Sequence, residues 1–105
     1  MLTEDLKSIF VIVPCFNEGS VVRQTVEGIL QKGYSVVVVD DASTDHTRKE
    51  LAGSGAAYIR HRCNLGQGAA IRTGIEYALR KGATIIVTFD ADGQHSTEDI
   101  PAMVS

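Results

Sequence analysis

Residues 84–95 read Thr84-Ile85-Ile86-Val87-Thr88-Phe89-Asp90-Ala91-Asp92-Gly93-Gln94-His95, and the rest of the chain can be interpreted around them. The first six are β-branched or aromatic and are entered through Lys81-Gly82-Ala83, which predicts a buried strand of a parallel sheet over residues 84–89. The carboxylates of Asp90 and Asp92 then come at the carboxyl end of this strand, where open α/β sheets bind ligands.

Asp90 and Asp92 are one residue apart and would repel each other. At about 4 Å and an effective dielectric near 20, two like charges cost roughly 4 kcal/mol. A divalent cation would turn this repulsion into attraction, and Gln94 offers a neutral oxygen two residues further on. Oxygen ligands of this kind suit Mg²⁺ or Mn²⁺. The alternative is that these acids form a turn and cap a final helix that begins near Ser96.

Working back from this segment, apolar runs alternate with helical periodicity along the whole chain. Strands are expected over residues 9–13, ended by Pro14, over residues 35–39, and at a sheet edge over residues 57–60. Helices are expected from an N-cap at Ser20 to residue 32, from about residue 46 to 52, and from the glycine-rich turn at residues 64–68 to residue 81.

This alternation predicts an α/β fold with a mainly parallel four-stranded sheet between helices, a three-layer α/β/α, Rossmann-like architecture. Residues 1–8 are expected to be a polar lead-in, and residues 9–105 to form a single domain. The third helix is expected to present a face of small side chains to the sheet, and the valine run at residues 36–39 to lie in the core.

Composition excludes several classes of function. The chain has 105 residues and a net charge of −3, without the basic stripe of a nucleic-acid-binding protein. The amino terminus lacks the pattern of a signal peptide, and no apolar run approaches the roughly 20 residues of a membrane span. Cys15 and Cys63 are isolated thiols without metal-ligand spacing, which favours a reducing, cytoplasmic location.

Acidic residues follow three of the predicted strands. Because the carboxyl ends of parallel strands share one edge, these acids should meet there. They are Glu18, Asp40, Asp41, Asp45, Asp90 and Asp92. Turn and capping preferences account for some of them, but the convergence of six favours a binding site.

Single residues near this edge have simpler interpretations. Asp45 is either a site residue or a first-turn acid that the helix dipole stabilises. Ser43 is interpreted as an N-cap, and His46 and His61 as surface histidines. Arg72 could bind a diphosphate through its guanidinium or pair with Glu76 four residues on.

Four ordered motifs carry a family resemblance: residues 14–18, residues 39–45, residues 64–68 with Arg72 and Gly74, and residues 90–95. Together they resemble the nucleotide-sugar-binding half of the inverting, family 2, GT-A type glycosyltransferases. Within that family the chain is most similar to the dolichyl- and polyprenyl-phosphate sugar transferases. The resemblance runs from Ile9 onward.

The resemblance implies a role for each matching position. The donor nucleotide would be bound by Pro14, Phe16, Glu18, Val39, Asp41, Arg72, Asp90, Ala91 and Asp92. The metal, Mg²⁺ or Mn²⁺, would be held by Asp90, Asp92 and Gln94, the first two forming the DXD motif. Asp41 would accept a ring N–H of the nucleobase. Phe16 stands where most members have Tyr, so stacking is kept and a phenolic hydrogen bond is lost.

The implied reaction transfers a hexose from a GDP- or UDP-linked donor to a polyprenyl phosphate, with inversion. A polysaccharide or lipid hydroxyl is the alternative acceptor, and it would need a carboxylate base. Family domains are about twice as long, so we expect the chain to be the donor-binding half, with any base outside it. A lipid acceptor would bring the full-length protein to the cytoplasmic face of the membrane.

Three other classes share parts of this pattern. Haloacid-dehalogenase-type phosphatases place Asp-x-Asp-Gly after an apolar strand, but they need downstream Lys and Asp residues. A phospho-receiver module would need a late Lys, and none follows Lys81. A dinucleotide-binding domain would need a third glycine after Gly66 and Gly68.

Overall fold

The computed structural model describes residues 6–91, and these form a short 3₁₀ turn, four strands and three helices. In chain order the elements are the 3₁₀ turn Leu6–Ser8, β1 (Ile9–Cys15), α1 (Gly19–Gln31), β2 (Ser35–Asp40), α2 (Thr47–Leu51), β3 (Ala57–Arg60), α3 (Gln67–Arg80) and β4 (Ile85–Thr88). None of the helices within residues 6–91 has the length and apolar character needed to cross a bilayer.

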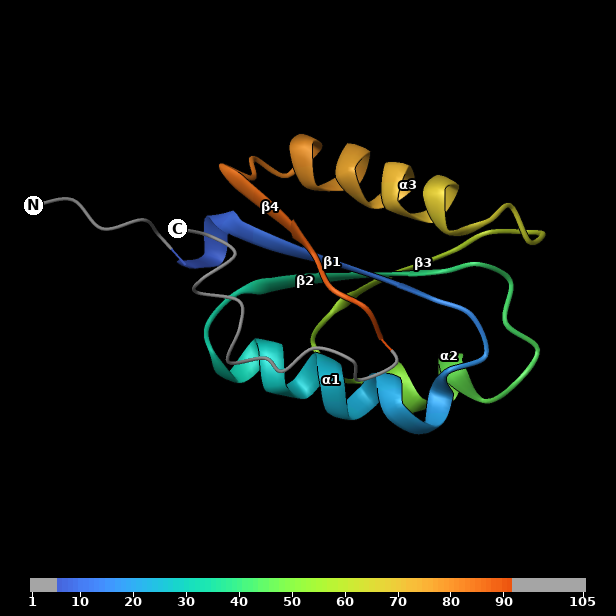
Figure 1. Cartoon of the computed structure of the whole chain (residues 1–105). Helices are drawn as coiled ribbons and strands as arrows, with labels where there is room; N and C mark the ends of the chain where they lie inside the picture. Colours follow the sequence, from blue (N-terminus) through green and yellow to red (C-terminus); the bar gives the residue numbers. More distant parts are fainter. Residues whose placement is uncertain (1–5, 92–105) are drawn as a thin grey trace, which may run out of the picture.

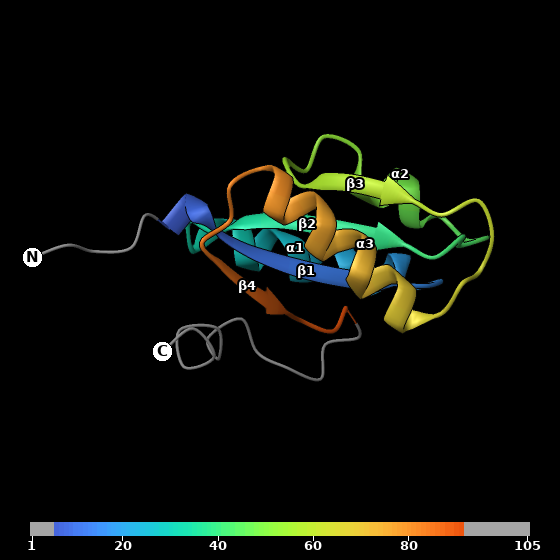
Figure 2. The same ribbon diagram turned by 90° about the horizontal axis from the view of Figure 1, so that it is seen from above.

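The four strands form one parallel sheet in the order β3-β2-β1-β4. Helices α1 and α2 cover one face of the sheet, and α3 covers the other (Figure 1). Seen from above, α3 runs over β1 and β2 (Figure 2). The predicted α/β class and its three layers are therefore confirmed.

The core lies on both faces of β1 and β2, whose side chains alternate between the two faces. Val11 and Val13 pack in the layer of α1, with Val26 among their neighbours. Ile12 and Val39 pack in the layer of α3. Because β2 is apolar on both faces, it must be an inner strand, as its residues 36–39 predicted.

Helix α3 approaches the sheet closely at Gly74. A Cβ atom added there would lie 2.4 Å from Cγ2 of Ile12 and 3.3 Å from Cγ2 of Val39. The buried face of the helix consists of Ala70, Gly74 and Ala78, one residue in each of three turns. The small-residue face that the sequence predicted is thus centred on the glycine.

Strand β1 runs through Pro14 to Cys15, so the prediction that Pro14 ends it was wrong. The carbonyl of Ile12 accepts a hydrogen bond from Phe89, on the β4 side, at 2.9 Å. Pro14 is two residues further and directs its nitrogen to the same side. The described pairing between β1 and β4 ends at Ile12 and Thr88. The N–H group that Pro14 lacks would lie beyond this point, so its absence removes no hydrogen bond between the two strands.

Three further boundaries differ from the sequence predictions. The strand expected over residues 84–89 is β4, which lies at an edge of the described sheet, so Ile85 and Ile86 are only half-buried. Helix α1 begins at Gly19 with Glu18 at the N-cap position, which places Ser20 inside the helix. Residues 6–8, which were assigned to the lead-in, form the 3₁₀ turn, and Ser8 Oγ lies 2.8 Å from Thr84 Oγ1.

Candidate functional site

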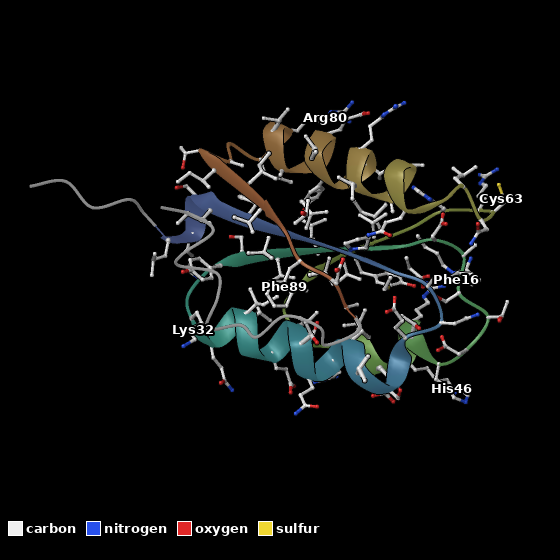
Figure 3. The ribbon with its side chains drawn as sticks, viewed as in Figure 1. Phe16, Lys32, His46, Cys63, Arg80 and Phe89 are labelled. Carbon is white, nitrogen blue, oxygen red and sulfur yellow. The ribbon has the colours of Figure 1, made fainter. Side chains whose placement is uncertain are left out.

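A cavity of about 310 Å³ lies at the carboxyl edge of the sheet, and we call it the carboxyl-edge cavity. It is lined by Pro14, Cys15, Phe16, Glu18, Asp41, Gln67, Ala70, Asp90 and Ala91. These residues come from the ends of β1, β2 and β4 and from the first turn of α3. Figure 3 shows Phe16 at this end of the molecule, together with His46 and Cys63.

The loops after β1 and β2 are joined by the side chain of Asn17. Its Oδ1 accepts hydrogen bonds from the backbone of Thr44 at 2.7 Å and of Asp45 at 3.2 Å. Its backbone N–H donates to Ser43 Oγ at 2.8 Å. Asn17 has a φ of 53°, a left-handed conformation that Asn tolerates better than most residues. The two loops therefore form one hydrogen-bonded unit.

Asp45 ties the beginnings of α1 and α2 together. Its Oδ2 accepts from Gly19 N at 3.1 Å, and its Oδ1 accepts from Thr47 N at 2.9 Å and from Thr47 Oγ1. The Thr47 hydroxyl bond is the main cause of a lowered pKa at Asp45. Asp45 is thus a structural acid outside the cavity lining. Ser43 likewise serves the loop unit, and it is no N-cap because α2 begins at Thr47.

Asp40 is fully buried and also lies outside the cavity lining. Its Oδ1 accepts from Ser43 N at 2.8 Å, and its Oδ2 accepts from the hydroxyl of Tyr58. Burial, followed by this hydrogen bond to Asp40, raises the pKa of Tyr58. Asp40 therefore anchors β3 and the second loop rather than facing a ligand.

Asp41 lines the cavity and is held by three donors. Its Oδ1 accepts from Leu65 N at 2.9 Å and lies 2.8 Å from His61 Nδ1. Its Oδ2 accepts from Gly66 N at 2.7 Å. Burial acts to raise the pKa of Asp41, but the hydrogen bonds from Leu65, His61 and Gly66 outweigh it, and the pKa is lowered. The carboxyl group is therefore ionised at neutral pH.

His61 was predicted to be a surface residue, and that prediction was wrong. Its side chain is 9% exposed and bridges Asp41 to α3, since its Nε2 lies 2.9 Å from Oγ1 of Thr73. The turn between β3 and α3 is thus fixed to the end of β2 through one carboxylate. The sequence predicted this turn as a glycine-rich helix start and as part of a family motif, and its contact with Asp41 adds a defined wall to the site.

Glu18 and Cys15 line the cavity beside Phe16. Glu18 Oε1 accepts a hydrogen bond from the backbone of Phe16 at 2.9 Å, which orients the carboxylate. Phe16 leaves 44% of its surface exposed, so its ring is available for stacking. Burial raises the pKa of the Cys15 thiol well above its ordinary value, and Asp40 and Glu18 add to this. Cys15 is therefore a buried wall residue whose thiol is neutral at neutral pH.

The chain is similar to known proteins in both sequence and structure. Residues 10–105 match the profile described as glycosyl transferase family 2. The chain belongs to glycosyltransferase family 2.

A relative from Methanocaldococcus jannaschii, itself an uncharacterized protein, is 44% identical over 59 residues, which are 55% of this chain and 24% of that protein. The mannosyltransferase PcManGT of Pyrobaculum calidifontis, solved with GDP-Man and Mn²⁺, superposes with a TM-score of 0.71. It is 29% identical, and the match covers 90% of this chain and 30% of that one.

Glucosyl-3-phosphoglycerate synthase of Mycobacterium tuberculosis, solved with Mn²⁺, UDP and glucosyl-3-phosphoglycerate, has a TM-score of 0.73. Its identity is 23%, and the match covers 90% of this chain and 37% of that one. At this level of identity the similarity to the synthase is a similarity of fold. The family 2 chain described here thus spans about a third of these solved proteins.

Six of the nine sequence-predicted donor residues of this family 2 domain line the carboxyl-edge cavity: Pro14, Phe16, Glu18, Asp41, Asp90 and Ala91. Val39 is fully buried and packs against α3, so its side chain does not face the cavity. Arg72 is exposed on α3, away from the cavity lining. Asp92 lies outside the described residues, and so does Gln94.

Of the three predicted metal ligands, Asp90 is described. It is partly exposed and lines the cavity, and its Oδ1 lies 3.5 Å from the Gln67 amide nitrogen. Within residues 6–91 no three His, Cys, Asp or Glu side chains gather as a metal site. A carboxylate oxygen on the cavity wall fits a hard divalent ion, and the other two predicted ligands, Asp92 and Gln94, lie outside the described residues.

Sequence reasoning missed His61, Asn17 and Gln67 as parts of the site. Gln67 lies within the motif at residues 64–68 and His61 lies three residues before it, so their positions were a usable signal. Asn17 lies within the first motif, but its partners are 26 to 28 residues away. No local pattern indicates such a contact.

Proposed function

We propose that this family 2 domain binds a nucleoside diphosphate sugar in the carboxyl-edge cavity and serves a hexosyltransferase. The observation that carries the proposal is the cavity itself, because three strand ends bring six residues of separate motifs to one space of about 310 Å³. That volume is of the size usual for small-molecule sites, which run from about 300 to 1,000 Å³. The proposed domain extends from residue 9 to residue 105.

The nucleoside would lie between the ends of β1 and β2. The exposed ring of Phe16 can stack on the base, and Asp41 is an ionised acceptor for an N–H group of that base. Glu18, oriented by the Phe16 amide, is suited to accept hydrogen bonds from ribose hydroxyls. Val39 would contribute through its backbone, because its side chain is buried.

The diphosphate would lie toward Asp90 and Ala91. Asp90, Asp92 and Gln94 would hold Mg²⁺ or Mn²⁺, whose chemistry is to stabilise negative charge on a leaving diphosphate as a Lewis acid. Support comes from the oxygen ligands in this motif and from the two solved family relatives, whose structures contain Mn²⁺.

The acceptor that we propose is a polyprenyl phosphate, attacked through its phosphate oxygen with inversion at the anomeric carbon. Such an oxygen is already anionic and needs little help from a base. This agrees with the described cavity, because its acids already accept hydrogen bonds from N–H groups and so are less suited to take a proton from an acceptor. A hydroxyl acceptor on a polysaccharide or lipid is the alternative, and it would require a carboxylate that could take a proton.

Binding of the donor part can be tested directly on the 105-residue chain. We expect UDP or GDP with Mn²⁺ to raise its melting temperature, while NAD does not, because a ligand that binds the folded state stabilises it. Asp90→Asn should abolish the Mn²⁺-dependent part of the shift. Equal shifts from NAD, or shifts unaffected by chelation and by Asp90→Asn, would contradict the proposal.

A further inference from the structure

The carboxylate of Asp41 has little hydrogen-bonding capacity left for a ligand. An ionised carboxylate offers about four acceptor positions, two on each oxygen. Within residues 6–91, Oδ1 is occupied by Leu65 N at 2.9 Å and His61 Nδ1 at 2.8 Å, and Oδ2 is occupied by Gly66 N at 2.7 Å. One position remains, and it is on Oδ2.

The bond between His61 and Asp41 has a fixed direction. Because the carboxylate is ionised, it can only accept, so Nδ1 of His61 must carry the proton and donate it. The ring cannot turn away easily, because Nε2 is held by Thr73 Oγ1 at 2.9 Å and the side chain is 9% exposed. His61 therefore keeps one position of Oδ1 permanently filled.

The amides that share the carboxylate are equally constrained. Leu65 and Gly66 belong to the turn that leads into α3, and Asn64 Nδ2 donates to the backbone oxygen of Asp41 at 3.3 Å. Gly66 has a φ of 99°, which favours glycine at that position. The protein therefore fixes which hydrogen-bonding positions of the Asp41 carboxylate are filled, and which one is open, before a ligand binds.

We propose that this arrangement selects the base of the donor: Asp41 accepts the single ring N–H of uracil, and His61 is the residue that excludes guanine. The inference rests on the proposed function. Guanine presents two parallel N–H donors, at N1 and N2, which suit a carboxylate with one open position on each oxygen. Here the second N–H would face an oxygen that His61 and Leu65 already fill.

Uracil presents one N–H, at N3, between two carbonyl groups, and so matches one open position. An N–H left unsatisfied in a closed site weakens binding by about tenfold or more. The family fold alone does not decide the base, because the two solved relatives contain GDP-Man and UDP respectively. The specificity is therefore assigned to the side chain at position 61.

The test is isothermal titration of the 105-residue chain with UDP, GDP and ADP in the presence of Mn²⁺. We expect UDP to bind at least about tenfold more tightly than GDP or ADP. His61→Leu, which removes the donor, should reduce the preference for UDP over GDP to about threefold or less by freeing Oδ1. His61→Asn places an N–H near the position of Nδ1 and should preserve the preference.

His46→Leu is the matched control, because His46 is exposed before α2 and lies outside the cavity lining. It should leave both affinities unchanged. Equal binding of UDP and GDP by the natural chain, or tighter binding of GDP or ADP, would overturn this inference and leave the proposed function intact. An unchanged preference in a folded His61→Leu would remove His61 from the selection. Failure of every nucleotide to bind would overturn the proposed function as well.

Discussion

At the scale of single residues, Asn17 joins the two loops that follow β1 and β2. Asn17→Ala would leave the backbone N–H groups of Thr44 and Asp45 without their shared acceptor. We expect it to lower the free energy of unfolding by roughly 1–3 kcal/mol. Urea denaturation measures this, and Asn64→Ala, which removes one 3.3 Å bond, is the control. Equal losses in the two variants would contradict the role given to Asn17.

Asp41 makes stability depend on pH. Its pKa is lowered from the ordinary value of 3.8 in the folded chain, so its contribution is present above that value and is lost as the pH falls through the lowered one. Asp41→Asn cannot titrate at this position. We expect the variant to be less stable at pH 7 and to lose stability less steeply below about pH 4. Parallel curves of unfolding free energy against pH would disprove this.

The two thiols should differ sharply in reactivity. Cys63 is exposed, whereas Cys15 is buried and its pKa is raised by burial and by the charges of Asp40 and Glu18. We expect iodoacetamide at neutral pH to alkylate Cys63 alone in the folded chain, as read by mass spectrometry. In Cys63→Ser, labelling should appear only in denaturant. Rapid alkylation of Cys15 in the native chain would refute the assignment.

At the scale of elements, the contact between α3 and the sheet is governed by one glycine. Gly74→Ala would place a Cβ atom 2.4 Å from Ile12 Cγ2, which forces the helix or the strand to shift. We expect a loss of about 1–3 kcal/mol in the free energy of unfolding. Gly68→Ala, in the same helix with open space around it, should instead be neutral or stabilising by up to about 1 kcal/mol. Equal effects would show that the close approach is unimportant.

The elements themselves were largely predictable from the chain. The valines of β2 are apolar on both faces, and helical spacing marked α1 and α3, so the layers followed from local pattern. The end of β1 was mispredicted because the effect of Pro14 depends on whether a neighbouring strand continues beside it. The edge position of β4 depends likewise on strand order, which no local pattern contains.

At the scale of the whole molecule, the predictable part of the site is the set of residues that follow the carboxyl ends of the strands, because a parallel sheet brings those ends to one edge. Asp41, Glu18 and Asp90 were predicted in this way and line one cavity. Asp40 ends β2 and Asp45 lies in the loop that follows it, yet their carboxylates accept hydrogen bonds from loop and helix-start backbone groups and do not face the cavity. His61 was missed because its partners, Asp41 just after β2 and Thr73 on α3, come close only after the layers have packed.

Donor binding should therefore be detected in three distant parts of the chain at once. With UDP and Mn²⁺, hydrogen exchange should slow in the segments around Phe16, Asp41 and Gln67, which line the cavity. Exchange around Gly33, at the opposite end of the sheet, should not change, which makes that segment an internal control. Protection limited to one of the three segments would argue against a shared cavity.

The close seat of α3 also has a consequence for how this domain can vary. Gln67, on the cavity wall, lies seven residues before Gly74 on one rigid helix, about 10 Å away along its axis. A larger side chain between the middle of α3 and the sheet would move the whole helix away from the sheet, including the first turn that lines the cavity. Substitutions far from a bound sugar nucleotide could thus change its affinity. A mutational scan should find such positions on the buried face of α3, at Gly74 and Ala78, as well as in the lining of the carboxyl-edge cavity.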